Sequence, residues 1–111
     1  ILTFPFISFQ QREELLKNIY NSLEKGGALI CVEKVRSEFS QTEDMLNQLY
    51  FDFKLEQELT EEEILEKAKS LRSSMYLDSH EILFNSLLES GFTRYETFFK
   101  CFNFVAYIAI K

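Results

Sequence analysis

Two adjacent glycines separate two different hydrophobic patterns near the start of this 111-residue chain. Before them, residues 10–25 place leucine, isoleucine and tyrosine side chains at helical spacing. After them, residues 28–35 form the apolar run typical of a buried strand. The chain has only three glycines, and Gly26 and Gly27 stand where a helix end needs a residue with positive φ. We therefore predict a helix that ends at this pair and leads directly into a strand.

The first four residues, "ILTF", extend this unit toward the N-terminus. They have the apolar character of a short buried strand, which Pro5 cannot continue in a central position. Strand, helix, glycine turn and strand form a βαβ unit, and its two strands should be parallel. Because the chain opens at Ile1 within an apolar run, as if cut inside an element, we expect part of the protein to precede it.

Five further elements are expected along the rest of the chain. Two of them begin with capping boxes, "TEEE" from Thr60 to Glu63 and "DSHE" from Asp78 to Glu81, and the second of these helices should end at Gly91. An alternating strand and a continuously apolar strand follow, and a tight turn between them makes them antiparallel neighbours. The predicted elements are helices over 37–57, 60–75 and 78–91 and strands over 93–102 and 104–111.

Composition excludes several classes of protein. Hydrophobic residues make up 46% of the chain, which indicates a folded domain, and the length suits one domain. The net charge of −6 gives no sign of a nucleic-acid surface. No apolar run reaches membrane-spanning length. Cys31 and Cys101 are too few for a disulfide framework, and we expect both to be buried, reduced thiols of a cytoplasmic protein.

The sequence alone predicts no complete active site and no metal site. Its single histidine, His80, lies at a helix start and is expected to be solvated or part of the capping turn. The carboxylates of "TEEE" suit an acidic first turn, and neither cysteine has an obvious base beside it. The glycines form no phosphate-binding loop. A set of C-terminal phenylalanines is expected to be core: Phe92, Phe98, Phe99, Phe102 and Phe104.

The order of elements, with "LEKGGALI" before the strand, resembles the C-terminal half of a class I S-adenosylmethionine-dependent methyltransferase. That α/β, Rossmann-like fold has the sheet order 3-2-1-4-5-7-6, so strands 4-5-7-6 are expected here, with strand 7 antiparallel. Further segments are similar to the carboxy-S-adenosylmethionine synthase family over nearly all of residues 1–111: "IYNSLEKGGALICVEK", "FDFKLEQELTEEEI", "MYLDS", "LLESGF" and "FFKCFNFVAYIAIK".

The resemblance implies an enzyme that makes a carboxylated S-adenosylmethionine from S-adenosylmethionine and prephenate, for modification of the tRNA wobble uridine to its 5-oxyacetic acid form. It also implies a homodimer, and a single unit over 1–111 with a helical insertion over 37–76. Thr3 aligns with a family asparagine beside the cofactor. Ala68 aligns with a family arginine that grips the product's carboxylate, and a methyl group cannot make that contact.

Alternatives remain for the function. The whole protein could be an ordinary S-adenosylmethionine-dependent methyltransferase of another substrate, or a non-catalytic interaction module of the same fold. A complete, stand-alone α+β binding domain is a third reading. We expect residues 1–111 alone to be inactive and to bind no cofactor. We also expect association with other chains, through an open edge at residues 1–4 or through the inserted helices.

Overall fold

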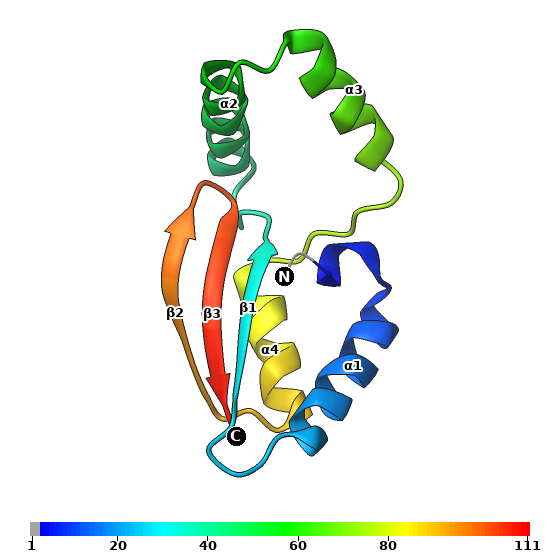
Figure 1. The fold of residues 1–111 in the computed structure, drawn as a ribbon, viewed down its shortest axis with the longest axis vertical. Coiled ribbons are helices and arrows are strands. Elements are labelled where there is room, and N and C mark those ends of the chain that lie inside the picture. Colours follow the sequence, from blue (N-terminus) through cyan, green and yellow to red (C-terminus); the bar gives the residue numbers. More distant parts are fainter. Residues whose placement is uncertain (1–2) are drawn as a thin grey trace.

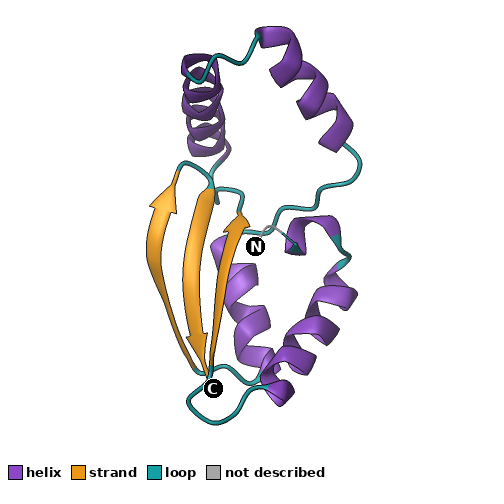
Figure 2. Ribbon diagram, viewed as in Figure 1, coloured by secondary structure: helices purple, strands orange, loops and turns teal. Residues whose placement is uncertain are grey.

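A three-stranded antiparallel sheet organises the chain in the computed structural model, which describes residues 3–111 (Figure 1). Helices lie along the sheet and beyond one of its ends (Figure 2). In chain order the elements are the 3₁₀ helix η1 (Phe4–Phe6), α1 (Phe9–Ser22), β1 (Ala28–Lys34), α2 (Ser40–Glu56), α3 (Glu61–Leu71), α4 (His80–Ser90), β2 (Arg94–Cys101) and β3 (Phe104–Ile110).

The sheet order β1-β3-β2 confirms the predicted fold class. β3 is the central strand and runs antiparallel to both neighbours, so that Ile110 pairs with Ala28 on one side and with Arg94 on the other. Taken as strands 5, 6 and 7 of the methyltransferase sheet, β1, β2 and β3 reproduce the order 5-7-6 with strand 7 antiparallel. The predicted tight turn between β2 and β3 is also present, with Phe102 at a φ of 50°.

The strand predicted at residues 1–4 is not found in the part of the chain that the structure describes. Its first two residues lie outside the described range. Thr3 is the N-cap of η1, and Phe4 belongs to that 3₁₀ helix, which has Pro5 in its first turn. Proline fixes φ near −65° and lacks an N–H, so it favours this helical turn over a strand. The parallel pairing predicted between residues 1–4 and the strand after the glycines is therefore not found among residues 3–111.

The hydrophobic core fills the space between one face of the sheet and the helices α1 and α4. Leu16 of α1 and Leu87 of α4 are fully buried against β3, where Val105 and Tyr107 are also fully buried. Phe92, which follows α4, joins them and meets the ring of Tyr20 edge-on at 5.0 Å between centroids. β3 is largely buried along its length, as its apolar run predicted.

The Gly26-Gly27 turn departs from the prediction in its role. α1 ends at Ser22 and is capped by Leu23 in an extended conformation, so the glycines are not the helix cap. Gly26 does adopt a positive φ of 85°. The turn is tied to the end of the chain, because Gly26 N–H donates to the Lys111 carbonyl and Lys111 N–H donates to the Gly27 carbonyl, both at 2.9 Å. The glycine turn therefore extends the hydrogen bonding between β1 and β3 at the end of the sheet.

The two predicted capping boxes have different outcomes. Thr60 and Glu63 form the expected reciprocal box at the start of α3, with the Thr60 N–H 2.8 Å from the Glu63 carboxylate. At α4, the predicted cap Asp78 is wrong by one residue: Ser79 caps the helix and accepts from the Ile82 N–H. The reason is tertiary, because Asp78 is ion-paired with Arg12 of α1.

The prediction that all the C-terminal phenylalanines and both cysteines are buried is wrong for β2. Phe98 is 60% exposed and Phe99 is 57% exposed, and Cys101 is exposed as well. The register shifts between Thr97 and Phe99, which marks a β-bulge. A bulge breaks the alternation of side chains across the strand, and β2 is an edge strand, so neither phenylalanine is covered. Cys31, on β1, is buried as predicted.

The helices α2 and α3 extend beyond the end of the sheet where β1 finishes (Figure 1). α2 contains no fully buried residue, and α3 buries only Ile64. The helices α2 and α3 therefore bury fewer side chains than the sheet and the helices α1 and α4 that cover it. The predicted helix to residue 75 stops at Leu71, and an irregular segment returns from there to η1, where the Tyr76 N–H donates to the Pro5 carbonyl at 2.6 Å.

Candidate functional site

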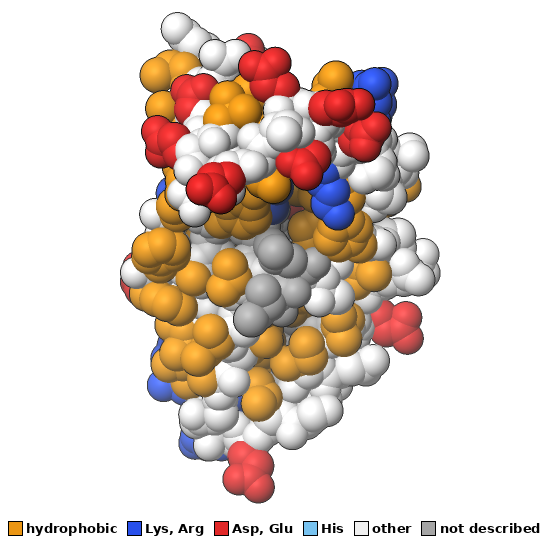
Figure 3. Space-filling model, turned by 45° about the horizontal axis from the view of Figure 1, so that its top comes forward, with side chains coloured by type: hydrophobic (Ala, Val, Ile, Leu, Met, Phe, Trp, Pro, Cys, Tyr) orange, Lys and Arg blue, Asp and Glu red, His pale blue; other side chains and the backbone are white. Residues whose placement is uncertain are grey.

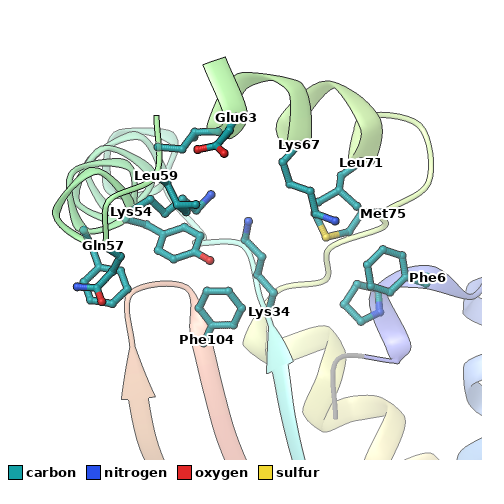
Figure 4. A pocket seen from close by; sticks show the side chains of 14 residues that line it. Phe6, Lys34, Lys54, Gln57, Leu59, Glu63, Lys67, Leu71, Met75 and Phe104 are labelled. Atoms are coloured by element: carbon teal, nitrogen blue, oxygen red, sulfur yellow. The ribbon is translucent and has the colours of Figure 1, made fainter. Parts of the chain in front are cut away.

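A cavity of about 660 Å³ lies where the end of the sheet, the helices α2 and α3, and η1 meet (Figure 4). Pro5 and Phe6 of η1 form one wall, and Ile64 of α3 and Met75 form another. Phe104 at the start of β3 lies at the base of the cavity, beside the carboxyl end of β1. In Rossmann-like sheets, ligands bind beyond the carboxyl ends of the strands.

Three lysines from three different elements face this cavity. Lys34 is the last residue of β1, Lys54 comes from the last turn of α2, and Lys67 comes from α3 (Figure 4). Two of them lie over aromatic rings. The Lys54 Nζ is 4.1 Å from the ring centroid of Tyr50, and the Lys34 Nζ is 5.7 Å from the same centroid and 5.9 Å from that of Phe104.

The environment disfavours the positive charge on two of these lysines. Burial lowers the pKa of Lys34, and the neighbouring Lys54 lowers it further, against an opposing contribution from Glu43. Burial also lowers the pKa of Lys54. Two partly desolvated ammonium groups side by side gain more from an anion than solvated lysines do, because an anion offsets both their desolvation and their repulsion.

Little negative charge opposes the lysines within the cavity. Among the described residues that line it, Glu63 is the one acidic side chain. Its carboxylate already accepts a hydrogen bond from the Thr60 N–H in the α3 capping box. In the space-filling view, several acidic side chains lie on the surface at the α2–α3 end of the molecule (Figure 3). The cavity therefore combines a net positive charge with apolar walls.

This arrangement suits binding better than covalent catalysis. The described residues that line the cavity include no histidine, cysteine or serine to act as a base or nucleophile. Ammonium groups attract carboxylates or phosphates, and the rings of Phe6, Tyr50 and Phe104 can cover an apolar body. The chemistry is that of a pocket for an organic anion.

Neither of the two site residues expected from the family pattern, Thr3 and Ala68, lines the cavity. Thr3 is exposed and precedes the η1 wall, and its backbone N–H group favours the charged form of Glu33. Ala68 is exposed on α3 and is not among the residues that line the cavity, whereas its neighbour Lys67 is. The roles of Thr3 and Ala68 stay predictions.

Sequence reasoning missed Lys34 and Lys54. A lysine at the carboxyl end of a strand was the available signal for Lys34, because that edge of the sheet holds the ligand in this fold class. Lys54 carried no such signal in the sequence. The structure also separates Lys67 from the cations that follow it, since Lys69 of α3 and Arg72, the C-cap of α3, do not line the cavity.

Residues 3–111 contain no group of three or more histidine, cysteine, aspartate or glutamate side chains that could hold a metal ion. His80 is the first residue of α4, as expected at a helix start. It is half-buried, however, with its ring edge-on to Phe84 at 5.4 Å, and burial lowers its pKa. Within the same residues, no helix has both the length and the apolar character needed to cross a membrane.

The known proteins to which this chain is similar share one name. The chain is 45% identical over all 111 residues to a carboxy-S-adenosyl-L-methionine synthase of Staphylococcus epidermidis and covers 49% of that protein. It is 36% identical over 109 residues to the synthase of Idiomarina loihiensis, covering 45% of it, and 38% identical over 109 residues to that of Photorhabdus laumondii, covering 43%. No family model matches the chain.

The chain spans about half the length of the curated relatives that it matches. The similarity is nevertheless continuous over the whole chain, from η1 through the cavity to β3. It agrees with the sheet order β1-β3-β2, which is that of the C-terminal part of a methyltransferase fold. By sequence and by fold, the chain is similar to the C-terminal part of the carboxy-S-adenosyl-L-methionine synthases, which has a methyltransferase fold.

Proposed function

We propose that the whole protein makes carboxy-S-adenosylmethionine from S-adenosylmethionine and prephenate. The observation that carries this proposal is the cavity in which Lys34, Lys54 and Lys67 face apolar walls. Prephenate is a dicarboxylate on a ring-sized body, so its charge and shape suit this cavity. The relatives' name supports a synthase of this kind.

In this proposal, the residues of the chain bind and orient the anionic substrate. The three lysines attract its carboxylates as point charges, and Tyr50 and Phe104 cover its apolar face. Apolar side chains of α2 and α3 line the cavity and lower the polarity around the ammonium groups, which strengthens each ammonium–carboxylate attraction. When bound, S-adenosylmethionine would supply its sulfonium methyl group, which loses a proton and gains the carboxyl group of prephenate, while the remainder of prephenate leaves as phenylpyruvate and water.

The described residues do not by themselves suit S-adenosylmethionine. Its sulfonium is a cation, and a cavity with three ammonium groups repels a cation. The ribose hydroxyls need a free acceptor, while the one carboxylate in the cavity, that of Glu63, is engaged at Thr60. We therefore expect residues 1–111 alone to bind no cofactor. Micromolar binding of S-adenosylmethionine to this chain in calorimetry would refute that expectation.

The test of the function uses the full-length protein. Incubation with S-adenosylmethionine and prephenate should give carboxy-S-adenosylmethionine, identified by mass spectrometry. Lys54→Met should raise the KM for prephenate about tenfold or more. Lys69→Met, a change on α3 outside the cavity, should leave that KM unchanged. Failure of the wild-type protein to make the carboxylated product would overturn the proposal.

Ala68 favours a second candidate, an ordinary S-adenosylmethionine-dependent methyltransferase. The methyl side chain of Ala68 cannot hold the carboxylate that the family arginine holds. If the lysines replace that arginine, Ala68→Arg should change carboxylated product formation little. If only the Ala68→Arg variant made the carboxylated product, the natural protein would instead be an ordinary S-adenosylmethionine-dependent methyltransferase of another substrate. Loss of both activities would favour a non-catalytic interaction module.

The remaining parts of the proposal concern the binding partners and the cellular location of the protein. The product would serve modification of the tRNA wobble uridine in the cytoplasm. We also propose a homodimer, supported by exposed apolar side chains on the inserted segment, among them Phe39, which is 74% exposed, and Met45 and Leu49 of α2. A monomer at high concentration in sedimentation would contradict the dimer, and unchanged wobble uridine in cells lacking the protein would contradict the tRNA role.

A further inference from the structure

Glu33 is a buried acid that the proposed function leaves without a role. Its side chain faces the helices from β1 and is 2% exposed. One of its carboxylate oxygens, Oε2, is buried without a hydrogen-bond partner among the described residues. Glutamate is almost never fully buried unless it is paired, so such a residue needs an explanation.

The contacts of Glu33 tie three segments together. The backbone N–H groups of Thr3 and Phe4 favour its charged form, and Phe4, Pro5 and Glu33 line one small space. Arg12 of α1 contributes an attractive charge and is itself ion-paired with Asp78, the residue before the α4 cap. This small space of about 10 Å³, near the size of one water molecule, lies between these side chains. Arg12 Nε is also buried and has no hydrogen-bond partner within residues 3–111.

The same segment forms a wall of the lysine-lined cavity. Phe4, held by Glu33, leads directly into Pro5 and Phe6, which line the cavity. On the other side of β1, the next residue, Lys34, presents its ammonium to the same cavity. Phe4 also packs in the core with Cys31 and Val35, and the Tyr76 N–H donates to the Pro5 carbonyl. The Glu33 carboxylate acts together with these contacts to set the position of that wall.

The charge on Glu33 costs stability. Burial raises its pKa, and this effect outweighs the opposing hydrogen bonds from Thr3 and Phe4 and the charge of Arg12. Cys31 and Tyr107 also lie near it, and burial is the main cause that raises their own pKa values. Lys34 and Asp78 line the same small space. A raised pKa means that the folded chain binds the proton more tightly, so this residue's contribution to stability falls as the pH rises through its titration.

We propose that Glu33 is a positioning residue whose buried carboxylate holds the Thr3–Phe4 backbone and thereby fixes the η1 wall of the anion cavity. A residue that costs stability at neutral pH but holds a cavity wall fits a role in function, because stability is often exchanged for site geometry. The inference rests on the proposed function only in taking this cavity as the substrate site.

The test compares Glu33→Gln with Glu96→Gln in the full-length protein. Glu96 is an exposed glutamate on β2 of the same sheet. At pH 7, Glu33→Gln should keep or raise the unfolding temperature, yet the Thr3 and Phe4 amides should lose about tenfold or more of their protection from hydrogen exchange in NMR, because hydrogen bonds to a neutral amide are weaker than those to a carboxylate. Glu96→Gln should change neither quantity.

A second readout separates this inference from the proposed enzyme activity. The fluorescent anion 8-anilinonaphthalene-1-sulfonate should bind the wild-type cavity less well as acid protonates Glu33, whereas Glu33→Gln should show weak binding without that pH dependence. Lys54→Met, which removes a cavity charge, should abolish cavity binding in both and so exclude other dye sites. The proposal would be overturned if the two amides kept their protection in the Glu33→Gln protein. It would also be overturned if that protein lost stability and amide protection uniformly along the chain. Both outcomes can be read whether or not the enzyme is active.

Discussion

Replacing Gly91 by alanine tests how tightly the end of α4 is packed against α1. Gly91 ends α4 with a φ of 113°, in the left-handed region that favours glycine. A Cβ at this position would lie 2.8 Å from two carbons of the Tyr20 ring, closer than any relaxed contact allows. The substitution therefore combines a backbone cost with a steric one.

The steric cost cannot be relieved easily, because the Tyr20 ring is held on two sides. Phe92 meets it edge-on at 5.0 Å between ring centroids. The Lys111 Nζ lies 4.7 Å from the ring centroid and donates to the Tyr20 carbonyl at 2.8 Å. Moving the ring would disturb a fully buried phenylalanine and the end of β3 at once.

The magnitude follows from these two contributions. A non-glycine residue in the left-handed region costs about 1–2 kcal/mol. Overpacking in a close-packed site adds about 1–3 kcal/mol. We therefore expect Gly91→Ala to reduce the free energy of unfolding by about 2–5 kcal/mol, a large part of the about 5–15 kcal/mol typical of a domain.

Gly26→Ala is the matched control. Gly26 also has a positive φ, but no atom lies within 4 Å of a Cβ placed there, so only the backbone cost of about 1–2 kcal/mol should remain. Urea unfolding followed by circular dichroism gives both values in the full-length protein. Equal losses for the two variants would refute the argument that the Tyr20 contact, and not φ alone, requires glycine at position 91.

Three other predictions can be measured on the same protein. Phe92→Ala should cost about 3–5 kcal/mol in urea unfolding because the ring is fully buried, while Phe98→Ala should change stability by about 0.5 kcal/mol or less. A thiol reagent should label Cys101 in the folded protein, but Cys31 only after unfolding, since it is buried and burial raises its pKa; equal labelling rates would contradict this. Thr60→Ala should lower stability by about 1 kcal/mol, and no loss would mean that the capping box is dispensable.

Local features of the fold could be predicted from the sequence, because a few neighbouring residues determine them. The Thr60–Glu63 capping box is contained within four residues, and Gly91 follows the last apolar turn of its helix. Both were predicted correctly. The order of the strands came from the family resemblance and not from such local patterns.

Features that depend on distant partners could not be predicted in this way. Asp78 and Ser79 are equally suitable helix caps by sequence, and the choice is made by Arg12, which is 66 residues away from Asp78. The bulge between Thr97 and Phe99 depends on the register of β2 with β3. The candidate site is the extreme case, since its lysines come from three elements and become neighbours only when α2 and α3 fold over the end of β1.

The pH dependence of anion binding provides a test of that convergence. Burial, and then the charge of Lys54, lower the pKa of Lys34, so Lys34 loses its proton at a lower pH than an ordinary lysine. Affinity for a dicarboxylate should therefore be full below this lowered pKa and fall as the pH rises through it. Folding stability should change in the opposite direction, because the folded chain binds fewer protons than the unfolded chain in that range.

Calorimetric titration of the full-length protein with prephenate, in two buffers with different ionisation enthalpies, measures this coupling directly. Binding on the alkaline side should take up protons, because the anion favours the charged form of Lys34 and raises its pKa. Lys34→Met should bind more weakly and take up fewer protons, and Lys69→Met should match the wild-type protein. If wild-type and Lys34→Met proteins took up the same number of protons and lost affinity over the same pH range, the titrating group would lie elsewhere, and Lys34 would not contact the anion.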